Sequence, residues 1–392
     1  MQGLKYISWG DNAGYAVAAK SYVRALVDAG VALTWSPMLA GKSGYEPYAG
    51  QRWPCADLAA VCNKPIDYDT VVIHTVPEYY PYWIQQERRQ GRRIFGCTVW
   101  ELEQLPDHWP QILNQLDGVI VPCSWNREVF RRSGVTVPIH VVAYLSQFEG
   151  MPAPSPQDQA TLLRHLGVGA ALQHRFVFYT VGFWSHRKAP YLSVEAYLRA
   201  FDAADPVLMI VKTSDKDFTR WQRNWRNAFR RRHPSPLKSI DKLKSRFPET
   251  ASVLVIADET LNNSEMLALH GLCDCFVSLA RTEGWGLGAF EAARLGKPVV
   301  MTGYGGQLDF LDPELTCLVD YRMVPVHEPA WPTNHRPTDH WAEPSVEQAA
   351  GYLREVFAHQ QAARERAQRQ ADRIAVKYSL SCIVEAFRKA LA

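Results

Sequence analysis

The sequence predicts an α/β protein made of two domains, each with a parallel β-sheet covered by helices. Its 392 residues exceed what one compact core usually holds, since domains cluster around ~100–200 residues. Short apolar runs of β type alternate with amphipathic helical stretches in both halves of the chain, which is typical of parallel sheets. Between the two series lies Glu149–Gln157, where three prolines in nine residues predict a linker or hinge.

The first half begins with a predicted strand at Tyr6–Trp9, a glycine-containing turn at Asp11–Tyr15 and a helix at Ala16–Ala29. Gly30 follows this helix and suits a helix C-terminus, because glycine readily adopts the left-handed conformation found there. The other predicted elements of this half are strands at Val31–Trp35, Thr70–His74, Arg93–Val99, Gly118–Pro122 and Val137–Val142 and a helix at Trp109–Leu116.

The second half repeats the alternation, with a predicted helix at Pro190–Ala203 and a long, mostly helical stretch at Glu343–Leu391. Its predicted strands are Phe176–Val181, Val207–Lys212, Ser252–Ile256, Cys275–Leu279 and Pro298–Thr302. We place the domains at residues 1–150 and 151–375, followed by a last helix at 376–392. Because ligands of such sheets bind beyond the carboxyl ends of the strands, functional residues are expected in the loops that follow strands.

Composition and charge favour a folded protein that stays in the cytoplasm. Hydrophobic residues make up 47% and charged residues 21% of the chain, and the formal net charge is only +3. No apolar run approaches the ~18 residues of a membrane-spanning helix. The eight cysteines form no C-x-x-C pair, which favours reduced thiols and argues against a structural metal site.

The segment Thr282–Ala292 combines a strand end, a glycine-rich turn and a helix start. It follows the predicted strand Cys275–Leu279 and leads into a predicted helix that begins near Leu287. Backbone N–H groups at a helix N-terminus bind anions, and glycines let a ligand approach the backbone. Glu283 and Glu291 flank this turn, and carboxylates accept hydrogen bonds from sugar hydroxyls, so a phosphorylated sugar suits the segment. The alternative is an ordinary buried turn with two surface glutamates.

The letters of this segment, E-G-W-G-L-G-A-F-E-A, resemble the Glu-x7-Glu signature of retaining glycosyltransferases of family four, which have the GT-B fold. The resemblance implies two Rossmann-like domains that face each other across a cleft, with the acceptor in the first and a nucleotide-sugar donor in the second. It also implies that the last helix, residues 376–392, crosses back to the first domain. It implies that Glu291 binds the ribose, that Glu283 is a catalytic residue at the donor sugar, and that N–H groups of Gly286 and Leu287 help to hold the donor. The Gly-Gly loop containing Gly306 also resembles this family and is expected to bind the donor.

A second motif, Val181–Pro190, follows the first strand of the second half and carries Arg187 and Lys188. Family members have a cationic pair in this loop that neutralises the diphosphate, so the resemblance implies this catalytic role for Arg187 and Lys188. An arginine fork binds two phosphate oxygens, whereas a lysine acts as a point charge. This chain has Phe183 where many members have an arginine. A solvated surface pair is the alternative.

The first half supplies further candidates near the ends of strands. Gly14 and Tyr15 resemble the family's loop that faces the donor phosphates. On the acceptor side, Trp100 and Glu101 stand where many members have a histidine. Glu101 is a candidate to orient or deprotonate an acceptor hydroxyl; the alternative is a carboxylate favoured by a helix start. His74 ends a predicted strand and is a candidate base, although a packing role is the favoured interpretation.

No metal or other cofactor is expected beside the nucleotide sugar. Asp67–Asp69 and Asp215–Asp217 spell D-x-D, a triplet that metal-dependent transferases of another fold use. Neither triplet adjoins the motifs above in the sequence. Arg187 and Lys188 would hold the diphosphate without a cation.

A basic cluster occupies residues 212–246, with twelve Lys or Arg against three Asp. Trp221, Trp225 and Phe229 recur in it at helical spacing. We favour a domain helix that buries these rings while its arginines face water. The alternatives are an anionic membrane surface or acidic glycan, and, least favoured, nucleic acid. Peripheral contact with the inner face of a membrane through residues 220–246 is therefore kept as an expectation, and nucleic-acid binding is not expected.

Together with the resemblance, these patterns predict a retaining glycosyltransferase. It would move a hexose-like sugar from a UDP- or GDP-sugar to a hydroxyl of a glycan or lipid-linked acceptor, in surface polysaccharide or glycoconjugate synthesis. The alternatives are a nucleotide-sugar epimerase or hydrolase on the same fold, and a non-catalytic protein that only binds the nucleotide sugar. The residues themselves name neither the base, the sugar nor the acceptor.

Overall fold

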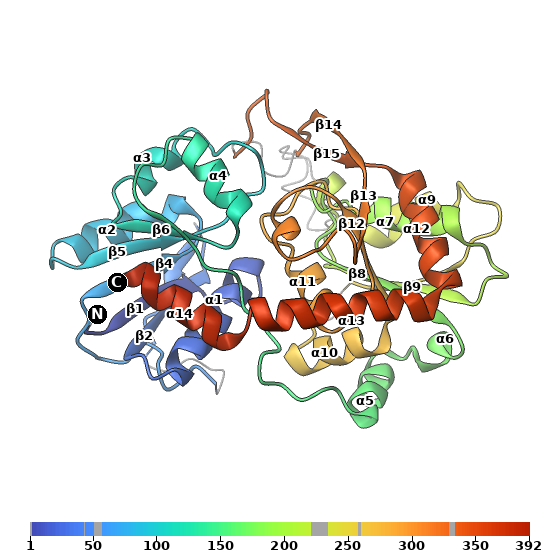
Figure 1. Ribbon diagram of the computed structural model, residues 1–392, viewed down its shortest axis with the longest axis horizontal. Coiled ribbons are helices and arrows are strands. Elements are labelled where there is room, and N and C mark those ends of the chain that lie inside the picture. The colour runs from blue at the N-terminus through green and yellow to red at the C-terminus, as the bar shows by residue number, and fades with distance from the viewer. Residues whose placement is uncertain (1, 43, 51–56, 221–233, 258–259, 329–333) are drawn as a thin grey trace. The chain divides into compact units, whose positions relative to one another are not determined.

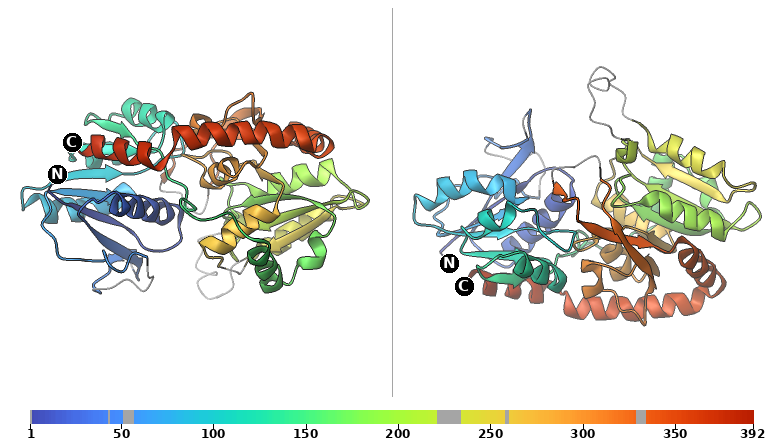
Figure 2. Two further views of the ribbon diagram at one scale, coloured as in Figure 1. Left: turned by 60° about the horizontal axis from the view of Figure 1, so that its bottom comes forward. Right: turned by 90° about the horizontal axis from the view of Figure 1, so that it is seen from above.

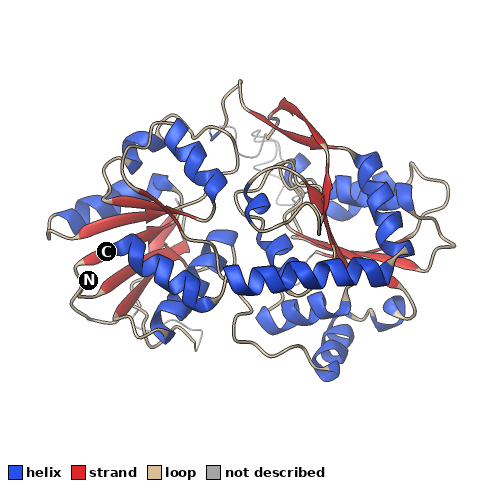
Figure 3. Cartoon of the chain, in the orientation of Figure 1, coloured by secondary structure: helices blue, strands red, loops and turns tan. Residues whose placement is uncertain are grey.

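The computed structural model describes residues 2–42, 44–50, 57–220, 234–257, 260–328 and 334–392. The chain forms two compact units, residues 1–149 with 376–392 and residues 150–375. Each unit has a largely parallel β-sheet at its centre with helices packed around it (Figures 1 and 3). The predicted α/β class with two Rossmann-like units is confirmed.

Seven strands form the sheet of the first unit. They are β1 (Leu4–Trp9), β2 (Leu33–Ala40), β3 (Tyr45–Pro47), β4 (Thr70–His74), β5 (Arg93–Cys97), β6 (Gly118–Val121) and β7 (Ile139–Val141). Their order across the sheet is β3-β2-β1-β4-β5-β6-β7. Neighbours run parallel except β3, which is antiparallel to β2. The central strand β4 is buried along its whole length, as expected for a strand with an apolar centre in a sheet covered on both faces.

The helices of the first unit are α1 (Gly14–Asp28), α2 (Tyr80–Arg88), α3 (Trp109–Leu113), α4 (Ser124–Arg132) and α14 (Leu380–Leu391). The last of these, α14, joins this unit although it lies at the far end of the sequence. Its buried side chains recur three and four residues apart, so they form one apolar face. Phe387 on that face lies against the rings of Tyr6 and Tyr22. Arg388 on the same helix donates to the carbonyl of Ala29 over 2.6 Å.

Six parallel strands form the sheet of the second unit. They are β8 (Phe176–Val181), β9 (Val207–Lys212), β10 (Ser252–Ile256), β11 (Cys275–Ser278), β12 (Val299–Thr302) and β13 (Cys317–Val319). Their order is β10-β9-β8-β11-β12-β13. The bounds of β8, β9 and β10 are those predicted from their apolar runs.

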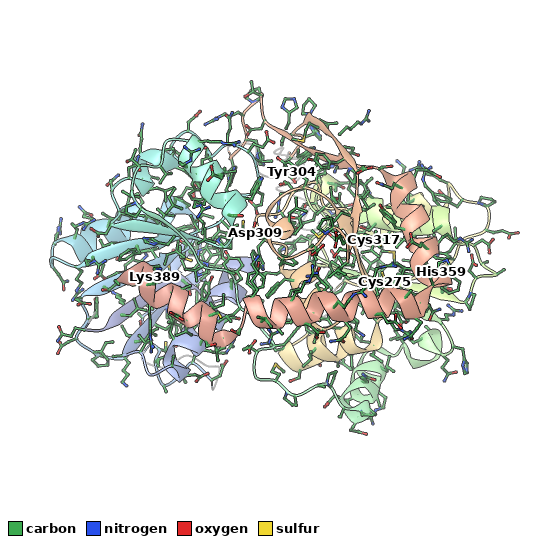
Figure 4. The ribbon with its side chains drawn as sticks, viewed as in Figure 1. Cys275, Tyr304, Asp309, Cys317, His359 and Lys389 are labelled. Atoms are coloured by element: carbon green, nitrogen blue, oxygen red, sulfur yellow. The ribbon has the colours of Figure 1, made fainter. Side chains whose placement is uncertain are left out.

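The described helices of the second unit are α5 (Pro156–Leu166), α6 (Gly169–Leu172), α7 (Pro190–Ala200), α9 (Pro236–Lys244), α10 (Asn263–Leu272), α11 (Leu287–Arg294), α12 (Val346–Ala358) and α13 (Gln360–Lys377). Helices α7 and α12 pack against each other and against the sheet, where Tyr197 and Leu353 are fully buried with Val277. Cys275 lies in the same core, among the crowded side chains seen in Figure 4. Helix α13 runs along the outside of this unit (Figure 2).

The strand order reverses beside β8, and this places the loops that matter for function. From β8 the chain moves to β9 and β10 on one side, and it then returns through α10 to β11 on the other side. The loops after β8 and β11 therefore leave the sheet at adjacent points of its carboxyl edge. Parallel sheets bind ligands at such a point, because the two loops diverge there and leave room between them. In the first unit the same reversal occurs between β1 and β4.

Two strands near the end of the second unit were not foreseen. β14 (Tyr321–Pro325) and β15 (His340–Pro344) form an antiparallel hairpin in which Arg322 faces Glu343. The prediction that Glu343 begins a helical stretch is therefore wrong for its first residues. The helix starts after Ser345, whose hydroxyl accepts a hydrogen bond from the N–H of Gln348 (3.2 Å) and caps it.

The proline-rich stretch is a linker only in its first part. Ser155 and Asp158 form a capping box, with Ser155 N–H donating to the Asp158 carboxylate over 2.8 Å, so α5 begins at Pro156. The predicted aromatic stripe of Trp221, Trp225 and Phe229 lies outside the described residues. Over the described ranges, no helix is long and apolar enough to cross a membrane.

We expect Phe387→Ala to destabilise the protein by about 3–5 kcal/mol, because the ring is 1% exposed and its loss leaves a cavity beside Tyr6 and Tyr22. Urea unfolding at constant protein concentration measures the change. The control is Lys389→Ala on the exposed face of the same helix, which should stay within about 0.5 kcal/mol of the parent. Equal stability of both variants would contradict the packing of α14 on the first unit.

Candidate functional site

The loops after β8 and β11 meet through an ion pair of three side chains. The Lys188 ammonium donates to Oε1 of Glu283. Arg187 Nη1 lies 3.3 Å from Oε2 of Glu283, and it also donates to the carbonyl of Thr282 over 3.1 Å. The residues predicted from two separate motifs, 95 or more positions apart, therefore occupy one place at the carboxyl edge.

Burial and charge act in opposite directions on Glu283. Its side chain is only 8% exposed, and burial by itself raises the pKa of a carboxyl group. The charges of Lys188 and Arg187 and their hydrogen bonds outweigh burial and hold the pKa of Glu283 below its usual value. The carboxylate is therefore ionised at neutral pH. Among these three side chains one positive charge remains in excess, which favours an anionic ligand.

The backbone of the β8 loop is folded so that both cations stay accessible. Ser185 is buried; its hydroxyl accepts the N–H of Lys188 (3.2 Å) and its carbonyl accepts the N–H of Ala189 (2.9 Å). Ala189 then adopts a left-handed conformation, with φ 40° and ψ 46°, immediately before α7. Such strain at a non-glycine residue is found where the surrounding structure enforces a functional shape. The side chains of Arg187 and Lys188 remain 23% and 26% exposed.

The glycine-rich turn leads into α11 as predicted. Gly286 is the N-cap of this helix and has φ 87° and ψ 60°, a conformation that costs a side-chain-bearing residue energy. The first N–H groups of α11, beginning at Leu287, have no acceptors within the helix and suit an anion. Trp285 holds the turn in place, because its ring packs against the rings of Phe290 and Phe310.

The Gly305–Gly306 loop packs against the glycine-rich turn and is hydrogen-bonded to it. The N–H of Gly306 donates to the carbonyl of Glu283 over 2.8 Å. Gly305 has φ 107°, and a Cβ at this position would lie 2.6 Å from the same carbonyl oxygen. Gly306 therefore holds Glu283 in place through its N–H group. Because this N–H is already used, it does not bind a ligand in this structure.

Glu291 lies in α11 but is nearly closed off from solvent, at 1% exposure. Its negative charge is near enough to contribute to the raised pKa of Tyr179, which is caused mainly by burial. The hydroxyl of Tyr179 pairs with Nδ1 of His270 at 2.6 Å, so polar groups line this side of the sheet.

At the carboxyl edge of the first unit, Tyr15 joins two strand ends. Gly14 is the first residue of α1, and the hydroxyl of Tyr15 donates to the carbonyl of Val99 (2.8 Å) and contacts the hydroxyl of Thr98 (3.0 Å). Burial raises the pKa of Tyr15, and the charge of Glu101 raises it further. Tyr15, expected on the donor side, and Glu101, expected on the acceptor side, therefore lie near each other at this edge, and their roles stay predictions.

His74 is a packing residue in this structure, which corrects its place among the acceptor-side candidates. The ring is fully buried, its Nδ1 pairs with the hydroxyl of Tyr6 at 2.8 Å, and its Nε2 has no hydrogen-bond partner among the described residues. Burial lowers the pKa of His74 to about 3. The ring cannot reach an acceptor hydroxyl in this conformation, and the lowered pKa makes it a weak base at neutral pH.

Trp100 is likewise held inside the first unit. It is 5% exposed, packs edge-on against Trp109 (ring centroids 4.8 Å apart) and donates from Nε1 to the carbonyl of Gln104 over 2.6 Å. Buried Asn126 fixes its backbone at both the N–H (2.8 Å) and the carbonyl (3.0 Å). Glu101 follows in an irregular bend rather than a helix, so the alternative of a helix-start carboxylate is wrong. Its side chain remains partly exposed.

The second aspartate of each D-x-D triplet is hydrogen-bonded within the protein. Asp69 lies at the amino end of β4, where its carboxylate accepts from Thr70 (2.8 Å). Asp217 is fully buried and accepts from the N–H of Thr219 (2.9 Å) and the hydroxyl of Ser239. Across the described part of the chain, no group of three or more His, Cys, Asp or Glu side chains is placed to hold a metal ion.

Sequence reasoning missed three polar residues that surround the Arg187–Lys188 loop. Arg281 forms an ion pair with Glu343, and Glu328 accepts a hydrogen bond from the backbone N–H of Arg187 over 3.1 Å. Arg281 is only two residues from Glu283, which is the one signal in the sequence that could have drawn attention to it. Glu328 and Glu343 offer no such signal, because their contacts depend on the β14–β15 hairpin.

A family model for Glycosyl transferases group 1 matches residues 256–320. This stretch contains β11, the glycine-rich turn with Glu283, α11 with Glu291 and the Gly305–Gly306 loop. The family model therefore matches the part of the chain in which the sequence motif was densest. No match is found among curated proteins.

Several solved structures resemble the chain over almost its whole length. HepE from Anabaena in complex with UDP-glucose has a TM-score of 0.69 at 12% identity, covering 100% of this chain and 99% of that chain. Sucrose-phosphate synthase from Thermosynechococcus elongatus has a TM-score of 0.64 at 15% identity, covering 99% and 98%. WaaG, a glycosyltransferase involved in lipopolysaccharide biosynthesis, has a TM-score of 0.61 at 13% identity, covering 99% of each chain.

At these identities the likeness concerns the fold, and it confirms the predicted GT-B fold. The matched family model and the fold agree on one class of protein, the glycosyltransferases. Assignment to family four, retention of configuration, the cleft between the domains and the acceptor stay predictions.

We expect Lys188→Met to destabilise the protein at pH 7 by roughly 1–3 kcal/mol, because buried Glu283 loses a charged hydrogen-bond donor. The folded-state pKa of Glu283 is depressed, so its stabilisation is present above the unfolded value of about 4.3 and is lost as pH falls through the folded-state pKa. The difference between parent and variant should therefore shrink from pH 7 to pH 3.

Urea unfolding across this pH range measures the effect. Lys238→Met, at an exposed lysine of α9, is the matched control and should track the parent at every pH. A difference between Lys188→Met and the parent that stays constant down to pH 3 would contradict the ion pair with Glu283.

We also expect Gly305→Ala to destabilise the protein by roughly 1–3 kcal/mol, because φ 107° and the carbonyl of Glu283 leave no room for a methyl group. Gly351→Ala is the control with the opposite sign. That helical glycine has open space around it, so alanine should stabilise by up to about 1 kcal/mol. Thermal unfolding of both variants checks the pair, and a neutral Gly305→Ala would contradict the close packing behind the turn.

Proposed function

We propose that the protein is a retaining glycosyltransferase that moves a hexose-like sugar from a UDP- or GDP-sugar to a hydroxyl of a glycan or lipid-linked acceptor. The synthesis of a surface polysaccharide or glycoconjugate is the setting we propose for this reaction. The donor would occupy the second unit and the acceptor the first.

One observation carries the proposal. Arg187, Lys188 and Glu283 come from two loops that meet where the strand order reverses, and Glu283 lies four residues before the first residue of α11. Two cations and a helix N-terminus attract a diphosphate, and the carboxylate between the cations suits the hydroxyls of the attached sugar. A solvated surface pair, the alternative for Arg187 and Lys188, does not explain why both converge on a buried carboxylate.

In the proposed reaction, the bond between the anomeric carbon and the diphosphate oxygen breaks and the acceptor oxygen bonds to that carbon. Negative charge then develops on the departing diphosphate. Arg187, Lys188 and the first N–H groups of α11 would stabilise this charge, and preorganised groups of this kind supply much of the rate enhancement in enzymes. Glu291 would bind the ribose, which requires that its side chain, 1% exposed in this structure, become accessible when the donor binds.

The structural relatives indicate which donor to test first. HepE has been solved with UDP, with UDP and glucose, and with UDP-glucose. A UDP-hexose is therefore our first choice, with a GDP-sugar as the second. On the acceptor side, partly exposed Glu101 beside Tyr15 is the candidate to orient the attacking hydroxyl, since His74 and Trp100 are buried.

We expect UDP, among UDP, GDP, dTDP, ADP and CMP, to raise the melting temperature of the parent. A UDP concentration of about 100 times its Kd should raise the free energy of unfolding by roughly 2.7 kcal/mol. Arg187→Met, Lys188→Met and Glu291→Ala should each weaken the shift, whereas Lys238→Met should leave it unchanged. If no nucleotide shifts the melting temperature, or the three site variants respond like the parent, the donor site is misassigned.

Turnover experiments separate the alternatives. A transferase consumes UDP-glucose only when an acceptor is present, a hydrolase releases UDP and free glucose without one, and a non-catalytic protein binds the donor but never consumes it. NMR of the product reports whether the anomeric configuration is retained. Epimerisation would appear as a new sugar released without any acceptor.

A further inference from the structure

The β14–β15 hairpin is fastened to the loop that carries Arg187 and Lys188. The backbone of Arg281 connects the hairpin to this loop by hydrogen bonds on both sides. Its N–H donates to the carbonyl of Arg187 over 2.8 Å, and its own carbonyl accepts the N–H of Ala342 in β15 over 3.1 Å. A shift of the hairpin would therefore move the backbone of the cationic loop.

The side chain of Arg281 adds a second fastening. It is 10% exposed and forms a two-point ion pair with Glu343, whose second contact measures 3.1 Å. The same guanidinium donates to the hydroxyl of Tyr191 over 2.6 Å and to the carbonyl of His186, the residue before Arg187. The planar fork of an arginine meets these partners at once, which a lysine could not do.

A third fastening comes from Glu328, after the end of β14. Its side chain is largely buried, at 7% exposure, and Oε2 accepts the backbone N–H of Arg187 at 3.1 Å. Burying a carboxylate costs free energy unless it is paired and hydrogen-bonded. Its presence beside two phosphate-binding cations also works against anion binding by simple charge, so an electrostatic contribution to the donor site does not explain it.

We propose that Glu343, acting through Arg281, and Glu328 are positioning residues that hold Arg187 and Lys188 in the geometry needed for a nucleoside diphosphate. This inference rests on the proposed function, because it takes the diphosphate as the ligand of the two cations. Neither carboxylate touches the ligand in this scheme. Both act on the backbone and neighbours of the cationic loop.

The sign of the effect distinguishes positioning from plain electrostatics. Removing a negative charge near an anion site should tighten diphosphate binding if only charge mattered. Loss of positioning should weaken it instead, since misplacement of binding groups by about 1 Å can cost up to about 100-fold. Glu343→Gln and Glu328→Met remove the negative charge while keeping the approximate size of the side chain, and Glu328→Met also removes the acceptor of the Arg187 N–H.

The experiment is calorimetric titration of the full-length parent and both variants with UDP and, separately, with uridine. We expect each variant to bind UDP at least roughly tenfold more weakly. The Kd for uridine should stay unchanged, because uridine has no phosphate groups to contact the two cations. A general loss of structure would weaken both ligands together, so the ratio of the two Kd values reports positioning alone.

Asp205→Asn is the matched control. Asp205 pairs with Arg354 at 3.0 Å in the same unit, before the amino end of β9 and therefore away from the carboxyl edge. Like Glu343→Gln, the substitution Asp205→Asn changes one carboxylate of an ion pair into an amide. The Kd values for UDP and for uridine should both stay at the parent level. Glu328→Met provides an independent test if Glu343→Gln does not fold, since it removes the acceptor of the Arg187 N–H, which an amide oxygen would still supply.

The outcomes separate the two levels of inference. If the parent binds neither UDP nor GDP, the proposed function fails and this inference with it; if it binds GDP alone, the same titrations are made with GDP and guanosine. If the parent binds UDP but both variants bind it equally well or more tightly, the donor site stands and the positioning role is overturned. An equal loss of affinity for UDP and uridine would also overturn it, because that result indicates a merely structural role.

Discussion

A buried carboxylate must be compensated by charge, and this requirement organises the carboxyl edge of the second unit. Glu283 is nearly buried, and it stays ionised because Lys188 and Arg187 reach it from the neighbouring loop. The arrangement depends on the strand order, which brings β8 and β11 together although about a hundred residues separate their loops. Without this strand order the two cations would lie in solvent, and burial would raise the pKa of the Glu283 carboxyl group.

The backbone around this ion pair is shaped by steric limits as much as by charge. Gly286 turns the chain into α11 through a left-handed conformation, and Gly305 lies too close to the carbonyl of Glu283 for any side chain. Ala189 accepts a strained conformation so that the chain can enter α7 directly after Lys188. These positions hold the cations and the helix N-terminus in one place before any ligand arrives, which lowers the cost of binding.

The two units share a fold but carry different chemistry at their carboxyl edges. At the edge of the second unit two cations and a carboxylate form one ion pair, whereas the edge of the first carries aromatic rings and hydroxyl groups around Tyr15, with the charge of Glu101 nearby. The partly exposed side chains of Tyr15 and Glu101 suit the hydrogen bonding of a hydroxyl-bearing acceptor. The division agrees with the proposed roles of the units, and it explains why His74, fully buried among tyrosines, packs rather than titrates.

The sequence by itself determined the α/β class, most strands and the pairing of Glu283 with a glycine-rich helix start, because apolar periodicity and glycine positions are local signals. The strands β8, β9 and β10 were predicted to the residue. Only the tertiary structure decided which predicted residues reach solvent: it buried His74 and Trp100, and it engaged the N–H of Gly306 with Glu283. It also decided that Glu328 and Glu343 approach the Arg187–Lys188 loop, since contacts across 141 and 62 residues follow from hairpin and sheet packing rather than from any spacing along the chain.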